Sequence, residues 1–169
     1  MTMDALPVKY RRRAAVEENA VRALIRTFGV VDRVMQPYFA GFGISGAQWG
    51  VLAQLHRAES EGLSSLRMTE LSNRLLVRLP SATGVIDRLV RDGLVGRVAL
   101  PEDLRVKLIS LTELGRRRVR DVLKDHDLQI ESMLGGLSVP EQNELRRLLT
   151  QMRVYLEKQL EDKSSAHRV

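Results

Sequence analysis

The sequence predicts a mainly α-helical protein, with six helices and one small β-hairpin. Apolar residues recur at three-and-four spacing over most of the 169 residues, which is the period of a helix that buries one face. Capping boxes at Ser45–Gln48 and Ser138–Glu141 mark the starts of two of these helices. Near the middle, the strand-like segments 97–100 and 105–111 flank a short polar turn, so they predict a hairpin.

Two helices are predicted before the middle of the chain. The first runs from about Ala14 to the glycines at positions 41 and 43. Its apolar face comprises Val21, Leu24, Ile25, Phe28, Met35, Tyr38, Phe39 and Phe42. Ser45 then caps a second helix, which turns Trp49 and Leu55 inward and fades in the polar run 57–62.

Between the second helix and the hairpin, the pattern predicts two shorter helices joined by a turn. Thr69 caps the first, and Pro80 suits the first turn of the second, where its missing N–H would have no partner. Gly93 stops that helix in a left-handed conformation. This order predicts a winged helix-turn-helix, with recognition helix 80–92 in the major groove of DNA and wing 97–111 at the minor groove.

Polar and basic side chains are expected on the outer face of the recognition helix and on the wing. Short hydroxyl side chains near a helix N-terminus reach base edges or phosphates, and glycine lets the backbone approach closely. An arginine near a wing tip suits the minor groove, and Asp103 is placed to hold Arg105 by a bidentate pair. Any single arginine fits a solvated surface equally well, so the prediction depends on the set. The predicted DNA-binding residues are Arg78, Ser81, Thr83, Gly84, Arg88, Arg91, Asp103, Arg105 and Lys107.

Composition agrees with a double-stranded DNA partner and excludes several other classes. The net charge of +6 suits a polyanion, whereas aromatics at 4% are too scarce for a stacking platform that binds single strands. The absence of cysteine excludes disulfides, thiolate metal sites and thiol redox sensing. No run approaches the apolar length of a membrane span, and the N-terminus lacks the apolar segment of a secretory signal, so we expect a cytoplasmic protein.

No catalytic or metal-binding motif is recognisable, so we expect neither an enzyme nor a cofactor. The histidines at 56, 126 and 167 are far apart in the sequence, and consecutive positions such as Asp125, His126 and Asp127 point in different directions on a helix. The segment 41–46 reads GFGISG and matches GxGxxG, but a helix rather than a strand enters it. The pattern therefore does not predict a dinucleotide-binding unit.

The segment DLRVKLISLTELG, and the runs DRL and GLV before it, resemble the MarR (multiple antibiotic resistance regulator) family over roughly residues 14–160. The matching positions are Asp87, Arg88, Leu89, Gly93, Leu94, Val95, Asp103, Arg105, Leu111, Thr112 and Gly115. The resemblance implies a homodimeric winged-helix transcriptional regulator, usually a repressor, released from DNA by small, often phenolic, ligands or by oxidation. Since the chain has no cysteine, thiol oxidation is excluded. Arg78-Leu79 and Leu104 depart from the polar-then-arginine pair and the basic residue that family members often carry, which affects the target sequence rather than the mode of binding.

The flanking helices are expected to pair two copies of the chain. Their apolar stripes exceed what one winged helix can cover, and two-fold dimers read half-sites of a pseudo-palindromic operator about one helical turn, roughly 34 Å, apart. A self-contained helical domain is the alternative. The predicted interface comprises Leu24, Val122, Ile130, Leu145, Leu148, Leu149, Met152 and Leu156. The predicted division is an N-terminal arm (1–13), a dimerisation region (14–44 and 113–162), a winged helix-turn-helix domain (45–112) and a tail (163–169).

A small-molecule effector is expected between the dimerisation and DNA-binding regions. A phenol or an aromatic acid bound there would change the spacing of the two recognition helices. The candidate lining residues, each of which also suits an ordinary core position, are Phe28, Met35, Tyr38, Phe39, Phe42, Trp49 and His56. The alternative function is a winged-helix protein-interaction adaptor without specific DNA binding.

Overall fold

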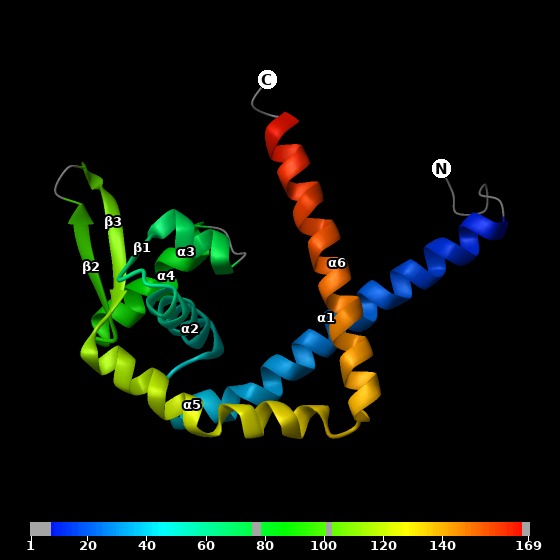
Figure 1. Ribbon diagram of the computed structural model, residues 1–169, viewed down its shortest axis with the longest axis horizontal. Helices are drawn as coiled ribbons and strands as arrows, with labels where there is room; N and C mark the ends of the chain where they lie inside the picture. Colours follow the sequence, from blue (N-terminus) through cyan, green and yellow to red (C-terminus); the bar gives the residue numbers. More distant parts are fainter. Residues whose placement is uncertain (1–7, 76–78, 101–102, 167–169) are drawn as a thin grey trace. The chain divides into compact units, whose positions relative to one another are not determined.

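The computed structural model describes residues 8–75, 79–100 and 103–166, and it leaves out some side chains near the ends of these ranges. In order, the elements are α1 (Val8–Gly41), α2 (Gly46–Ser60), β1 (Leu66–Arg67), α3 (Met68–Leu75), α4 (Leu79–Arg91), β2 (Val95–Leu100), β3 (Asp103–Leu111), α5 (Glu113–Leu134) and α6 (Val139–Ala166) (Figure 1). The predicted fold class, mainly helical with a winged helix, is confirmed. By contact the chain divides into two units, Met1–Asp125 and His126–Val169.

The terminal helices are longer than predicted. α1 begins at Val8, so the backbone of the basic segment 9–13 is helical rather than part of a mobile arm. α6 continues to Ala166, so most of the tail expected after residue 162 is helical too. A sequence pattern misplaces such helix ends because polar residues at a helix terminus carry no apolar period. Within the described residues, no helix is both long enough and apolar enough to cross a membrane.

The start of α2 confirms the predicted capping box. The Gln48 amide N–H donates to Ser45 Oγ at 3.2 Å, and the Ser45 N–H donates to Gln48 Oε1 at 2.9 Å. Gly43 enters this turn with φ +67, a conformation that glycine adopts without strain. The predicted cap at Thr69 is wrong, because α3 begins one residue earlier at Met68. There, Glu70 Oε2 accepts a hydrogen bond from the Arg67 N–H at 2.7 Å.

The wing belongs to a three-stranded antiparallel sheet of order β1-β3-β2. Ile109 lies opposite Leu66 on one side and Arg97 on the other, so the buried middle of β3 has a partner strand on both edges. An irregularity in register between Ala99 and Leu100 follows, where the two long strands approach the hairpin turn. The predicted hairpin is therefore present, with β1 as an additional short strand.

The core of the first unit lies between α2, α3, α4 and β3. Leu52, Leu71, Ile86, Leu89 and Ile109 have no exposed surface. They come from four elements, and in each element the apolar face of the helix or strand points into the core. This shared core fixes the recognition helix α4 and the sheet relative to each other.

A tight junction joins the wing to α5. The Thr112 hydroxyl donates to the Gly93 carbonyl at 2.7 Å, and it accepts from the Gly115 N–H at 3.0 Å, so it caps α5. A Cβ on Gly115 would overlap the carbonyl oxygen of Leu94. Glycine at position 115 is therefore required by close backbone approach, whereas Gly93 is required by its positive φ of +68.

The second unit contains the end of α5 and all of α6. The Ser138 N–H and hydroxyl both donate to Glu141 Oε2, at 2.8 and 2.6 Å, which confirms the helix start but replaces the reciprocal box with a two-donor contact. These hydrogen bonds lower the pKa of Glu141. Gln142 Nε2 closes the preceding turn by donating to the Leu137 carbonyl at 3.0 Å. Along the described part of α6 no side chain is buried.

Candidate nucleic-acid interface

The recognition helix α4 has one anchored face and one free face. Ala82, Ile86 and Leu89 are buried against the core. Among the predicted DNA-binding residues of α4, Ser81, Gly84, Arg88 and Arg91 are exposed, and Thr83 is half-buried. No heavy atom lies within 4 Å of the position of an added Cβ on Gly84, so the backbone there is open to a close partner. The helix therefore presents hydroxyls, a bare backbone and two cations on a rigid support.

An ion pair that the sequence pattern does not reveal joins the recognition helix to the wing. Arg97 Nη2 of β2 lies 2.7 Å from Asp87 Oδ1 of α4. The Arg97 side chain is partly buried, at 28% exposed. Because the pair spans ten positions across two elements, no short-range motif predicts it. The pair links strand β2 of the wing to the recognition helix.

A basic hollow lies beside the start of α3, between α4 and the sheet. Its volume is about 420 Å³, and it is lined by Arg67, Met68, Thr69, Thr83, Arg97, Val106 and Lys107. The hollow brings together the predicted residues Thr83 and Lys107, and it adds Arg67, Thr69 and Arg97, which the sequence pattern did not indicate as site residues. Arg97 already pairs with Asp87, but Arg67, Lys107 and two threonine hydroxyls lie beside a helix N-terminus, and this set suits a phosphate oxygen. The signal for Arg67 was its position directly before a helix start.

For three of the predicted DNA-binding residues, the structure describes the side chain of only one. Arg78 lies outside the described residues, and the side chain of Arg105 does too, although its backbone belongs to β3. Asp103 is exposed at the first position of β3. The predicted pair between Asp103 and Arg105 therefore stays a prediction.

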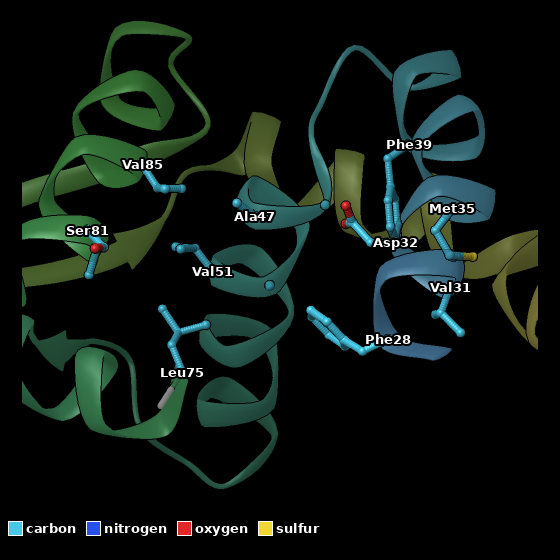
Figure 2. A pocket seen from close by; sticks show the side chains of 13 residues that line it. Phe28, Val31, Asp32, Met35, Phe39, Ala47, Val51, Leu75, Ser81 and Val85 are labelled. Atoms are coloured by element: carbon cyan, nitrogen blue, oxygen red, sulfur yellow. The ribbon is translucent and has the colours of Figure 1, made fainter. Parts of the chain in front are cut away.

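A groove of about 510 Å³ runs over α2, within the first unit (Figure 2). Its lining residues are Phe28, Val31, Asp32, Met35, Phe39, Gly46, Ala47, Gly50, Val51, Leu75, Ser81, Ala82 and Val85. The predicted ligand residues Phe28, Met35 and Phe39 are brought together here. Sequence reasoning missed Asp32 and the contribution of α4, since neither belongs to an apolar stripe of α1 or α2.

The other predicted pocket residues have different surroundings. Tyr38 donates a hydrogen bond to the Val122 carbonyl at 2.5 Å and packs edge-on against Phe42. Trp49 stacks on Phe39 with ring centroids 5.8 Å apart and does not line the groove. His56 is half-buried on α2 and does not line the groove. None of these four side chains lines the groove.

Most of the predicted dimer residues present apolar surface. Leu24, Ile130, Leu145, Leu148, Leu149 and Leu156 are exposed, and Met152 is half-buried. Val122 requires a correction, because it is fully buried in the core of its own chain and its side chain is not available to a partner. The Tyr38 hydroxyl of the same chain donates a hydrogen bond to the Val122 carbonyl.

Ion pairs hold α5 and α3 to α2. The Arg116 guanidinium donates to both oxygens of Glu59, at 2.8 to 3.2 Å, which raises the pKa of Arg116. Arg74 lies 2.8 Å from Glu61 and lowers the pKa of that carboxyl.

Burial lowers the pKa of His126, and Asp127 opposes that effect. The described residues contain no group of three or more His, Asp or Glu side chains that could hold a metal ion.

Comparison with known proteins identifies the family. The MarR family model matches residues 42–105. The HTH-type transcriptional repressor YetL of Bacillus subtilis is 31% identical over 139 residues, which cover 80% of this chain and 81% of that protein.

Solved structures show the same fold. A cysteine-to-serine variant of MarR from E. coli, complexed with operator DNA, has a TM-score of 0.69 and 27% identity, and the match covers 79% of this chain and 96% of that one. Bordetella bronchiseptica BpsR, whose DNA binding is regulated by 6-hydroxynicotinic acid, has a TM-score of 0.73 at 23% identity over 80% of this chain and 98% of its own. The chain belongs to the MarR family of DNA-binding transcriptional regulators.

Proposed function

We propose that the protein is a homodimeric repressor that binds a pseudo-palindromic operator and is released by a small ligand. One observation carries the DNA-binding part. The buried side of α4 is anchored in the core, and its free side presents Ser81, Gly84, Arg88 and Arg91 to a groove. The similarity to a MarR structure complexed with operator DNA, and to a repressor by name, supports the assignment.

The basic hollow supports a division of labour between phosphate and base contacts. Arg67, Arg97 and Lys107 line it beside the start of α3. Phosphate contacts of this kind fix the register of a protein on the duplex without reading sequence. The free face of α4 is then left to read base edges in the major groove.

The dimer is supported by apolar surface that the single chain does not cover. On α6, Leu145, Leu148, Leu149, Leu156 and Leu160 are all exposed and recur at helical spacing. Contiguous exposed apolar surface of this kind marks interaction sites in folded proteins. A two-fold pairing would cover it and would give each operator half-site its own recognition helix.

Release by a ligand is supported by the groove over α2. The lining comes from α1 on one side and from α3 and α4 on the other (Figure 2). A molecule bound there contacts the recognition helix directly, through Ser81, Ala82 and Val85. It shifts DNA affinity only if it binds the DNA-bound and free conformations unequally.

A salt titration of DNA binding tests the proposal. The probe is the DNA upstream of the gene for this chain, with a scrambled duplex as competitor, in a gel-shift or anisotropy assay. We expect log affinity to fall linearly with log salt, and Arg105→Ala to weaken operator binding by about 1–3 kcal/mol with the fold intact. Arg153→Ala, which removes the same charge from the exposed pair with Glu157 on α6, is the matched control.

Three results would count against parts of the proposal. Binding that is absent or insensitive to salt would favour the protein-interaction adaptor. Equal affinity for the operator and the scrambled duplex would remove sequence reading. If Arg105→Ala and the control Arg153→Ala behave alike, the wing does not contact the groove.

A further inference from the structure

The groove over α2 has a floor of small residues and two apolar walls. Gly46, Ala47 and Gly50 of α2 form the hollow of the floor, and Figure 2 shows Phe28 and Phe39 of α1 on one side of it and Val85 and Leu75 on the other. Its volume of about 510 Å³ lies in the usual range for small-molecule pockets, about 300–1,000 Å³. The shape therefore fits a compact apolar ligand.

Asp32 is the one charged side chain among the described residues that line this groove. Gln36 Nε2 donates to its Oδ2 at 3.2 Å, which is the single hydrogen bond of this carboxylate within the described part of the chain. Its Oδ1 faces the floor, where it would lie 3.6 Å from a Cβ on Gly46. Asp32 is an exposed side chain, so water solvates its Oδ1 at the edge of an apolar groove as long as no ligand covers it.

The negative charge of Asp32 favours apolar ligands that carry a positive charge or a hydrogen-bond donor. A ligand that covers the groove removes water from Oδ1, and burying an unpaired carboxylate oxygen is costly unless the ligand supplies a donor or a positive charge. Gly46 is the first residue of α2, so the positive end of that helix already faces a carboxylate and offers no free anion site. A bound organic acid would instead add a second negative charge close to the first.

We propose that this groove binds an apolar organic cation, whose ammonium group pairs with Asp32. Phe28 and Phe39 lie in the same wall, and a cation over the open face of either ring would gain cation–π attraction. The inference rests on the proposed function for its regulatory meaning, since the cation would be the effector that releases the operator. It replaces the phenol or aromatic acid expected from the sequence with a positively charged ligand.

Three probes of nearly the same shape isolate the charge. They are 1-adamantylammonium, the neutral 1-adamantanol and the anion 1-adamantanecarboxylate, each titrated into the full-length protein without DNA by calorimetry. We expect the ammonium to bind at least tenfold more tightly than the alcohol, and the carboxylate to bind most weakly. The emission of Trp49, the one tryptophan of the chain, provides a second readout, because its ring stacks on Phe39 of the lining.

Two substitutions locate the site. Asp32→Asn keeps the size of the side chain and should lower the affinity for the ammonium at least tenfold while leaving the alcohol within about twofold. Asp121→Asn removes the same charge from an exposed pair with Lys124 on α5 and should leave all three affinities unchanged. Ala47→Phe places a ring on the groove floor and should weaken all three probes together.

The outcomes separate this inference from the proposed function. Tighter binding of the carboxylate, no binding of any probe, or an Asp32→Asn variant that binds the ammonium as well as the parent protein would each overturn it. Operator affinity is then measured with and without the ammonium. If the cation binds through Asp32 but leaves operator affinity unchanged, the ligand assignment stands and release by this ligand is wrong.

Discussion

The winged helix and helix α6 differ in how far a single chain completes them. In the winged helix, Leu71, Ile86, Leu89 and Ile109 are withdrawn from solvent by neighbouring elements of the same chain. Along α6, by contrast, Leu148 is 48% exposed and Leu160 61% exposed, although both belong to a regular apolar stripe. The DNA-reading part is therefore a folded unit in one chain. The apolar stripe of α6 is explained if a second chain covers it.

The largest expected effect comes from Leu148→Asp, which tests the α6 side of this contrast. In a two-fold interface the change occurs twice, and burying a leucine contributes about 1.5–3 kcal/mol, so dimerisation should weaken by about 3–6 kcal/mol. The helix itself should persist, since the side chain is half exposed within one chain. Sedimentation analysis should show monomers, with the helical circular dichroism retained.

Thr150→Asp is the matched control for this prediction. It introduces the same charge on the opposite side of α6, at an exposed position about 130° from the middle of the apolar stripe. We expect it to remain dimeric. If the Leu148→Asp protein is also dimeric, a second chain does not cover this stripe of α6.

Ile86→Ala tests the winged-helix side of the contrast. Ile86 has no exposed surface, so the truncation leaves a cavity in a core that the chain completes alone. We expect a loss of about 2–5 kcal/mol in the free energy of unfolding, measured by urea denaturation at fixed protein concentration. Val139→Ala, at a position 69% exposed on α6, should change it by less than about 0.5 kcal/mol. Similar losses for the two variants would show that the two regions do not differ in this way.

Gly115→Ala tests the junction between the wing and α5. The added Cβ would overlap the Leu94 carbonyl, so the backbone must move, and we expect a loss of about 1–3 kcal/mol in the free energy of unfolding. Gly29→Ala in α1 is the control, because no heavy atom lies within 4 Å of the added methyl. That variant should gain up to about 1 kcal/mol from helix propensity. A neutral effect of Gly115→Ala in thermal and urea unfolding would mean that α5 can move away from Leu94 without cost.

The sequence predicted local features well and missed those that depend on the tertiary fold. The Ser45–Gln48 capping box and the stop at Gly93 were predicted correctly, since each depends on residues a few positions apart. The apolar stripe of α5 gave no means of separating positions that its own chain buries from those left for a partner. Val122, buried beneath Tyr38, was therefore assigned to the wrong surface.

The candidate sites show the same limit. Exposed polar positions on α4 followed from the helical period of the recognition helix. The place of Asp32 in the groove did not follow from a period. An aspartate on a long helix is expected to be solvated, and only the tertiary fold brings α2 beside it. Likewise, Arg67 lines the basic hollow only because α3 packs beside the sheet.

The smallest expected effect comes from Asp87→Asn, which loosens the link between the recognition helix and the wing. The pair with Arg97 is partly exposed, so we expect a loss of less than about 1 kcal/mol in the free energy of unfolding. Its functional effect should be clearer than its effect on stability. Removing a carboxylate beside the DNA-facing surface raises affinity for any duplex, whereas freeing the wing lowers discrimination between operator and scrambled DNA.

A double-mutant cycle with Arg97→Met isolates this pair, because methionine keeps much of the apolar stem and removes the charge. If the pair positions the wing, the two substitutions should be non-additive in operator discrimination and nearly additive in affinity for the scrambled duplex. Asp121→Asn controls for a simple change in net charge, since its partner Lys124 lies on α5 rather than on the wing. Additive effects on discrimination would show that the contact between Asp87 and Arg97 stabilises the surface without setting the geometry of the wing.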